Sequence, residues 1–209
     1  MADTTSVWER VRGVVPVSLC DWPGKITCVL FTAGCNLRCP TCHNASLAWH
    51  WHDLPALDRN TIVDDLHRRV RWLDGITVSG GEPTHLPGLV DLVADLATVG
   101  LPIKVDSNGS DPDMLDRLLR SGLARTVAVD VKGPWELYPE LTGQALSASD
   151  AKRCLERVFD LAREFPGQVL FRCTKVPLLT DKELESTRKQ VPDGQPFVFQ
   201  DFVPPRSEK

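Results

Sequence analysis

Three cysteines lie close together in the sequence, and their spacing suits a metal cluster. Cys35, Cys39 and Cys42 follow the pattern C-x3-C-x2-C within the run Gly34-Cys-Asn-Leu-Arg-Cys-Pro-Thr-Cys-His-Asn44. Thiolates bind zinc or iron–sulfur clusters, and both a closed zinc site and an electron-carrying [4Fe-4S] cluster take four protein ligands. Three ligands in one loop therefore predict a [4Fe-4S] cluster in which one iron stays open for chemistry.

Two other uses of these cysteines stay open at this point. Cys20, Cys28 or His43 could complete a tetrahedral zinc site, and a C-x2-C pair can also form a redox disulfide. The chain has seven cysteines and no secretory signal pattern, so we expect reduced thiols. Cys154 and Cys173 lie in apolar helical and strand patterns, and we expect core packing for them and for Cys20 and Cys28.

Length and composition are those of one globular domain. The chain has 209 residues, of which 42% are apolar, and we expect a single domain over 1–209 with a frayed tail at about 204–209. No run reaches the roughly 18 apolar residues of a membrane span, so a cytoplasmic protein without a membrane partner is expected. A net charge of −4 argues against a nucleic-acid partner.

Short β-branched runs alternate with amphipathic stretches, which is typical of a parallel sheet whose strands are joined by helices. The expected strands are 26–31, 76–79, 103–106, 127–131, 169–174 and 197–202, and helical spacing appears within 62–73, 89–97, 115–119 and 154–165. Asp111 before Pro112, and Thr180 three residues before Glu183, mark helix starts. Six units are too few for a closed eight-stranded barrel. We predict an α/β fold, a partial (β/α)6 TIM-type barrel, with a flavodoxin-like doubly wound sheet as the alternative.

The distinctive polar motifs all follow expected strands. The cysteine loop follows the first strand, Gly80-Gly-Glu82 the second, Asp106-Ser-Asn-Gly109 the third and Asp130-Val-Lys132 the fourth. The carboxyl ends of parallel strands meet at one edge, where such folds carry their sites. We therefore expect these motifs to converge.

Together these motifs give the chain a resemblance to a known family. It resembles radical S-adenosylmethionine (SAM) enzymes of the activase type, most of all anaerobic ribonucleoside-triphosphate reductase activating proteins, and next pyruvate formate-lyase activating enzymes. The matching segments are 18–25, the cysteine run, Ser79-Gly-Gly-Glu-Pro83, Asp106–Gly109, Asp130–Lys132 and Arg172-Cys-Thr174. The resemblance implies that SAM binds the open iron and is cleaved by one electron to a 5′-deoxyadenosyl radical. That radical would take a hydrogen atom from a glycine of a partner enzyme.

The resemblance also implies a set of site residues. Cys35, Cys39 and Cys42 would hold the cluster, and the cofactor-binding residues would be Thr41, His43, Gly80, Gly81, Glu82, Asp106, Ser107, Asn108, Asp130, Lys132 and Arg172. Glu82 offers a carboxylate to the ammonium of SAM, next to two glycines that let the backbone approach a ligand. Thr41 stands where an aromatic residue is usual, so no stacking role is carried over to it.

Two interpretations stay open for the acids at the strand ends, and two for the cations. Asp106, Ser107 and Asp130 could bind a monovalent cation, as the matching positions do in pyruvate formate-lyase activating enzymes, or cofactor hydroxyls; alternatively the acids cap turns. Lys132 and Arg172 would balance the charge of the ligand carboxylate and the cluster, or would simply pair with Asp130 or Glu82.

Further expectations concern the partner and the remaining motif. The expected partner is a glycyl-radical enzyme, the large subunit of an anaerobic ribonucleotide reductase, with flavodoxin or ferredoxin as reductant. Few residues follow the last strand, so an open arc suits a protein loop as substrate. The alternatives are a small-molecule enzyme resembling 7-carboxy-7-deazaguanine synthase and a zinc-binding module. Trp49-His-Trp-His52 is expected to be a loop whose two Trp rings pack on the sheet.

Overall fold

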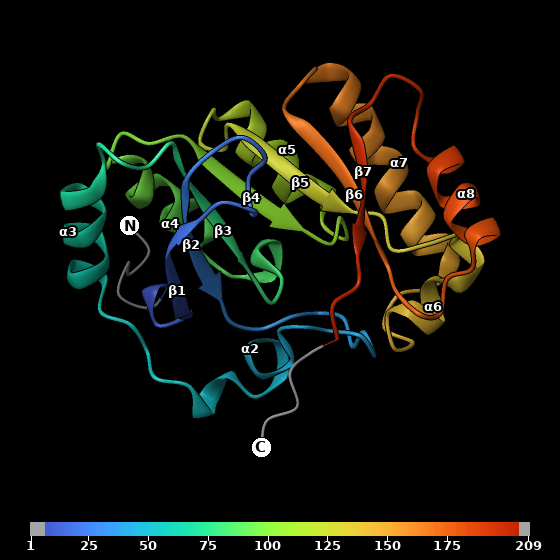
Figure 1. The fold of residues 1–209 in the computed structure, drawn as a ribbon, viewed down its shortest axis with the longest axis horizontal. Helices are drawn as coiled ribbons and strands as arrows, with labels where there is room; N and C mark the ends of the chain where they lie inside the picture. Colours follow the sequence, from blue (N-terminus) through green and yellow to red (C-terminus); the bar gives the residue numbers. More distant parts are fainter. Residues whose placement is uncertain (1–6, 205–209) are drawn as a thin grey trace.

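The computed structural model of the chain describes residues 7–204, and Figure 1 shows the order of its elements. The strands are β1 (Val11–Ser18), β2 (Thr27–Thr32), β3 (Gly75–Gly80), β4 (Ile103–Ser107), β5 (Thr126–Asp130), β6 (Val169–Lys175) and β7 (Phe197–Asp201). The α-helices are α2 (Ala45–Trp49), α3 (Arg59–Arg69), α4 (Leu89–Ala97), α5 (Pro112–Arg120), α6 (Tyr138–Leu141), α7 (Ala148–Glu164) and α8 (Asp181–Gln190). Short 3-10 turns are η1 (Trp51–Asp53), η2 (Pro83–His85) and η3 (Trp135–Leu137).

The strands form one sheet whose spatial order, β1 to β7, is also the order of the chain. Strands β2 to β7 pair in parallel, which confirms the six predicted strands, and β1 pairs antiparallel with β2. A doubly wound sheet reverses its order at a switch point, and this sheet does not. The structure therefore confirms the partial (β/α)6 barrel. Strand β1 was not predicted, because Gly13 and Pro16 interrupt its apolar run.

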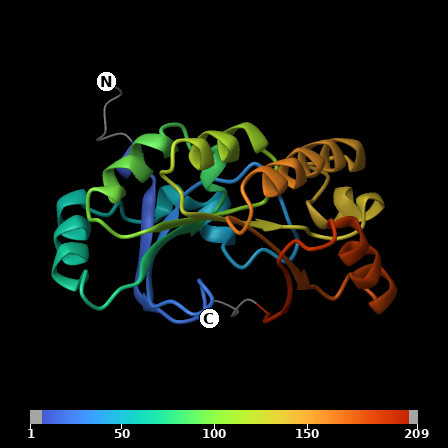
Figure 2. The ribbon, with the colours of Figure 1, turned by 90° about the horizontal axis from the view of Figure 1, so that it is seen from above.

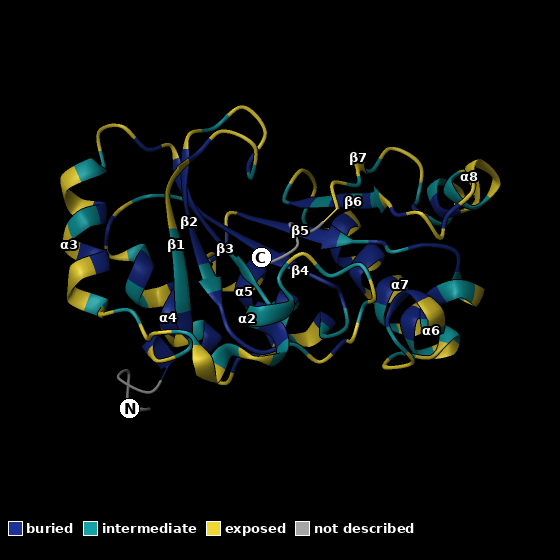
Figure 3. Ribbon diagram, turned by 60° about the horizontal axis from the view of Figure 1, so that its bottom comes forward, coloured by how far each residue is buried: buried dark blue, intermediate teal, exposed yellow. Residues whose placement is uncertain are grey.

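The sheet curves into an open arc, from β1 and β2 in blue to β7 in red, with helices α3, α4, α5, α7 and α8 around its outside (Figure 2). Strands β2 to β5 are buried along most of their length, whereas the edge strands β1 and β7 are partly exposed and the helices expose their outward faces (Figure 3). Leu30, Val78, Val105 and Val129, on four successive strands, are fully buried. A parallel sheet covered in this way needs apolar strands, which is the pattern the sequence shows.

Helix starts follow from local capping chemistry. Asp111 accepts a hydrogen bond from the backbone N–H of Met114 at the start of α5, and Thr180 and Glu183 form a capping box at the start of α8. Each cap satisfies N–H groups that have no partner within the helix. Both predicted helix starts are confirmed.

The cysteines outside the trio differ from one another in burial. Cys28 and Cys173 are fully buried and Cys154 is half-buried, so core packing is confirmed for the first two and holds in part for the third. Cys20 is exposed, and its prediction was wrong. It lies in the turn after β1, where its backbone N–H donates to the Ser18 hydroxyl and its side chain is left in solvent.

The expected Trp-His loop is helical. Trp49 ends α2 and Trp51 begins η1, so the prediction of a loop packed on the sheet was wrong. Trp51 instead lies beneath the guanidinium groups of Arg10 and Arg12, whose central carbons are 4.1 and 5.2 Å from its ring centre. Cation–π contacts of this kind stabilise an aromatic ring away from the core.

Two further expectations concern the chain as a whole. Of the tail predicted to fray, residues 205–209 lie outside the described residues. Within residues 7–204, no helix combines the length and the apolar character needed to span a bilayer.

Candidate functional site

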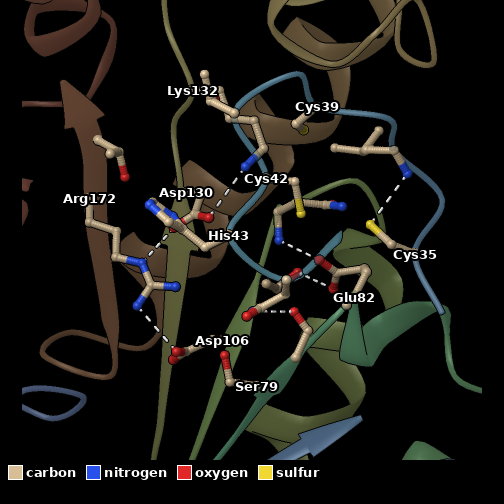
Figure 4. Close-up of a pocket in the computed structure, with 18 of the residues that line it drawn as sticks. Cys35, Cys39, Cys42, His43, Ser79, Glu82, Asp106, Asp130, Lys132 and Arg172 are labelled. Carbon is tan, nitrogen blue, oxygen red and sulfur yellow. Dashed lines mark hydrogen bonds and ion pairs between the residues drawn. The ribbon is translucent and has the colours of Figure 1, made fainter. Parts of the chain in front are cut away.

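The carboxyl ends of the parallel strands surround a cavity of about 400 Å³. Its lining includes every site residue expected from the sequence, namely Cys35, Cys39, Thr41, Cys42, His43, Gly80, Gly81, Glu82, Asp106, Ser107, Asn108, Asp130, Lys132 and Arg172. Figure 4 shows the three cysteines at the top and right of this cavity, Arg172 and Asp130 on its left and Asp106 below, with Lys132 near Cys39 and Glu82 near Cys35. The structure thus brings together residues that are up to 137 positions apart in the chain, from Cys35 to Arg172.

The cysteine loop is held from both sides by the rest of the chain. Leu37, between the first two cysteines, is buried, and its carbonyl accepts a hydrogen bond of 2.9 Å from the indole N–H of Trp49. The next backbone N–H, that of Arg38, donates to the carbonyl of Thr142 at 3.0 Å. These hydrogen bonds hold the cysteine loop in place, although its own residues form no strand or helix.

All three cysteines of the loop are free thiols and are partly buried. Burial raises the pKa of Cys35 to about 11, although the backbone N–H of Leu37 partly offsets this effect. Burial also raises the pKa of Cys42. A bound metal would reverse these shifts, because thiols lose their protons when they bind a metal.

The donor set of the loop suits a cluster. In residues 7–204, no three His, Cys, Asp or Glu side chains are grouped so that they could hold one metal ion. A cubane does not require such a group, because each cysteine binds a different iron. Cys35, Cys39 and Cys42 line the same cavity, so they fit a cluster that takes one thiolate at each of three corners.

Gly80 and Gly81 fit tightly against the chain itself. A Cβ at Gly80 would lie 2.3 Å from the backbone oxygen of Thr32, and one at Gly81 would lie 2.1 Å from that of Gly34. The backbone N–H groups of Gly81 and Glu82 donate to these same oxygens, each at 2.8 Å. Gly80 is therefore required by the approach of the end of β2 and Gly81 by that of the cysteine loop, which the sequence did not indicate.

Glu82 joins the ends of β3 and β4. Its buried carboxylate accepts hydrogen bonds from the backbone N–H and hydroxyl of Thr84 (3.0 and 2.6 Å), the hydroxyl of Ser107 (2.9 Å) and the backbone N–H of Asn108 (2.6 Å). Burial raises the pKa of Glu82, and these four donors offset part of that rise. Three donors reach Oε1 and one reaches Oε2, so Oε2 has the free lone pair for a ligand.

A ladder of alternating charges runs along the inner wall of the arc. Arg172 donates from Nε to Asp130 at 2.5 Å and from Nη1 to Asp106 at 3.2 Å. Lys132 is 3.3 Å from the other oxygen of Asp130, and Lys104 contacts the other oxygen of Asp106. The pairing of Lys132 and Arg172 with Asp130 matches one of the two interpretations above, and neither cation pairs with Glu82.

These charges shift one another's pKa values. Burial alone would raise the pKa of Asp130, but Arg172 and Lys132 outweigh it and lower the pKa to about 2. Burial opposes the charge of Arg172 and Lys132, yet Asp130 raises the pKa of both. All three groups are therefore charged at neutral pH.

Thr41 and His43 flank the last cysteine at the rim of the cavity. The His43 imidazole is exposed, contacts the carbonyl oxygen of Val203, and lies 5.3 Å from the ring of Phe202 between centroids. The segment after β7 thus lies against the cysteine loop.

Several residues of the site were not singled out from the sequence. Asp21, Asn44 and Gln200 also line the cavity, and Asn44 donates to the carbonyl of Gly80 at 2.8 Å, which ties the cysteine loop to the glycine turn. Lys104 is buried beneath Asp106. Asn44 is the last residue of the cysteine run, which was the available signal; a lysine inside a strand gave none.

Comparison with known proteins agrees with this geometry. Residues 29–191 match the model of the Radical SAM superfamily. A protein of Methanocaldococcus jannaschii, named provisionally as a glycyl-radical enzyme activating enzyme, is 31% identical over 198 residues, covering 93% of this chain and 80% of its own. The pyruvate formate-lyase-activating enzyme of Clostridium pasteurianum is 27% identical, covering 88% and 75%. The anaerobic ribonucleoside-triphosphate reductase-activating protein of Salmonella typhi is 33% identical, covering 41% and 56%.

A solved structure supports the fold. Methylornithine synthase (PylB) superposes with a TM-score of 0.64 at 15% identity, covering 86% of this chain and 54% of its own. The superfamily match spans most of the chain and includes the cysteine loop, the glycine turn and the charge ladder. The chain therefore belongs to the radical SAM superfamily, among the glycyl-radical enzyme activating enzymes and their relatives.

Proposed function

We propose that this protein generates a glycyl radical on a partner enzyme, and that this partner is an anaerobic ribonucleoside-triphosphate reductase. The observation that supports this function best is the single cavity in which three free thiols face the carboxylates and cations of the strand ends. The relative from M. jannaschii, matched over 93% of this chain, supports the same class of activity.

Membership of the superfamily implies a [4Fe-4S] cluster and SAM as cofactors. When bound, they supply a one-electron reductive cleavage of SAM. Cys35, Cys39 and Cys42 would hold the cluster, one thiolate at each of three irons. A reductant of the flavodoxin or ferredoxin type would deliver the electron, and the reduced thiols suit the cytoplasm.

The remaining residues would bind and orient SAM. Lys132 and Arg172 carry positive charge that attracts its carboxylate, and they are 22% and 19% exposed toward the cavity. Oε2 of Glu82 would accept a hydrogen bond from its ammonium group, while the three bonds to Oε1 keep the carboxylate in place. Thr41, His43, Gly80, Gly81 and Asn108 would complete the wall.

The choice of partner rests on the motifs that resemble ribonucleotide reductase activating proteins. The relative of that name aligns over 41% of this chain, whereas the pyruvate formate-lyase-activating enzyme aligns over 88%. Both names describe enzymes that act on a protein, which supports a protein substrate. The experiment below decides between the two partners.

The test is formation of a glycyl radical. The reconstituted protein, SAM and a reductant are mixed without oxygen with each candidate partner, and the sample is examined by electron paramagnetic resonance. We expect a doublet with the ribonucleotide reductase and none when its radical glycine is changed to alanine. A doublet only with a pyruvate formate-lyase would change the partner. No doublet with any candidate, together with turnover of a purine precursor, would favour the small-molecule alternative.

The cluster has its own test with a matched control. Cys39→Ala is expected to remove bound iron and the brown colour, whereas Cys154→Ala should keep both and cost about 1 kcal/mol of stability from a small cavity. Iron analysis and the visible spectrum after anaerobic reconstitution measure this. Stoichiometric zinc without iron in the wild-type protein would reject the proposal in favour of a zinc module.

A further inference from the structure

Every carboxylate oxygen of Asp106 and Asp130, at the ends of β4 and β5, has a cationic partner. Oδ1 of Asp106 contacts the ammonium of Lys104, and its Oδ2 accepts from Arg172 at 3.2 Å. Oδ1 of Asp130 accepts from Arg172 at 2.5 Å, and its Oδ2 lies 3.3 Å from Lys132. Three cationic side chains therefore contact all four carboxylate oxygens of the two aspartates.

The third residue expected to bind a cation is engaged as well. The hydroxyl of Ser107 donates to Glu82 at 2.9 Å and accepts from the backbone N–H of Gly109 at 3.0 Å. A hard monovalent cation would need several of these oxygens at once. Lys104, Lys132 and Arg172 already give three positive charges against the two carboxylates, so a further cation would meet an excess of positive charge. The residues present therefore do not fit such an ion while the ladder is intact.

Lys104 is the unusual member of this ladder. It lies two residues before Asp106 on β4, so both side chains point to the same face of the sheet, the inner one. Its side chain is only 1% exposed, and Asp106 is its one ion-pair partner within residues 7–204. An ammonium group in such a place is stable only if it is paired. Its ammonium group lies beneath Asp106, at the place where a bound cation would lie under the floor of the cavity.

We propose that the ammonium of Lys104 takes the place of a bound monovalent cation, so that this protein binds SAM without potassium or sodium. Lys104 is a positioning residue. Its ammonium balances the charge of the Asp106 carboxylate from below, at Oδ1, so that Arg172 can pair with Oδ2 of Asp106 and with Asp130 at the same time. This inference rests on SAM binding in the proposed function, but its structural part can be tested without SAM.

The first experiment uses the full-length protein without cluster or SAM. Its melting temperature is measured in KCl, NaCl and choline chloride at the same ionic strength, about 0.15 M. The wild type is expected to melt at one temperature in all three salts. Lys104→Ala should melt lower, and higher in KCl or NaCl than in choline chloride, because a small ion can enter the space beside Asp106 and choline is too large.

The second experiment measures SAM affinity of the reconstituted protein by equilibrium dialysis. Wild-type affinity should be the same in the three salts, whereas Lys104→Ala should bind SAM at least about tenfold more weakly in choline chloride than in KCl. Lys175→Ala is the control, because Lys175 is also a strand lysine paired with an aspartate, Asp201, but at the surface. It should show no dependence on the salt.

The outcomes separate the inference from the function. Tighter SAM binding by the wild type in KCl than in choline chloride would overturn the inference, and this measurement needs no variant to fold. A Lys104→Ala protein that responds alike to all three salts would also overturn it. Failure of the wild type to bind SAM in any salt would count against the proposed function, while the melting temperatures would still test the role of Lys104.

Discussion

Asp130→Asn should destabilise the protein by an amount that can be worked out from the charge ladder. Arg172 and Lys132 lower the pKa of Asp130 from 3.8 to about 2, against the opposing effect of burial. At about 1.4 kcal/mol for each pKa unit, this shift corresponds to roughly 2 kcal/mol of stability at pH 7. Asparagine keeps the size of the side chain and leaves both cations facing a neutral amide.

The effect should depend on pH with a defined sign. Because the folded-state pKa of Asp130 is lowered, its contribution is fully present above about pH 4 and is lost as the pH falls through 2. The difference in unfolding free energy between wild type and Asp130→Asn should therefore be flat from pH 7 to about 4. It should shrink below that pH.

Urea unfolding of the cluster-free protein under reducing conditions measures this difference. Asp113→Asn is the control: Asp113 pairs with Arg157, but its side chain is 72% exposed, so its removal should cost less than about 1 kcal/mol. If Asp130→Asn costs no more than the control at pH 7, or if its cost does not change between pH 4 and 2, the energetic account of the ladder is wrong.

Two further predictions concern the cysteine loop. Gly81→Ala should cost more than about 3 kcal/mol in urea unfolding, because its Cβ would overlap the carbonyl oxygen of Gly34, whereas Gly100→Ala, with φ +84° and open space around it, should cost about 1 kcal/mol. An equal cost for the two variants would contradict the close contact. In the cluster-free protein, the rate at which iodoacetamide alkylates Cys35, followed by mass spectrometry, should still rise beyond pH 10, because burial raises the pKa of this thiol to about 11. A plateau below pH 9 would show that the thiol is less buried than the structure indicates.

The sequence was sufficient for features that depend on neighbouring residues. Spacing identified the cysteine trio, caps at Asp111 and Thr180 identified two helix starts, and alternating runs identified the six parallel strands. Parallel strands bring their carboxyl ends to one edge, so the convergence of the motifs could also be predicted. The structure places all of them on one cavity.

Other features depend on which segments meet in space. Strand β1 forms only because β2 offers it an edge, and a run with Gly13 and Pro16 carries no strand signal by itself. From the sequence, Gly80 and Gly81 were expected to let the backbone approach a ligand, whereas in the structure they let the backbone of Thr32 and of the cysteine loop approach.

The sequence by itself determined which chemistry is present: three thiols, a glycine turn with an acid, and aspartates beside cations. Only the tertiary structure decided how the charges are paired. Arg172 reaches Asp106 across 66 positions of the chain, and Lys104 lies buried beneath the same carboxylate, where a lysine read from sequence would be placed at the surface. The physical reason is that an ion pair in a dry interior depends on distances and burial, which only the packing of the strands against one another sets.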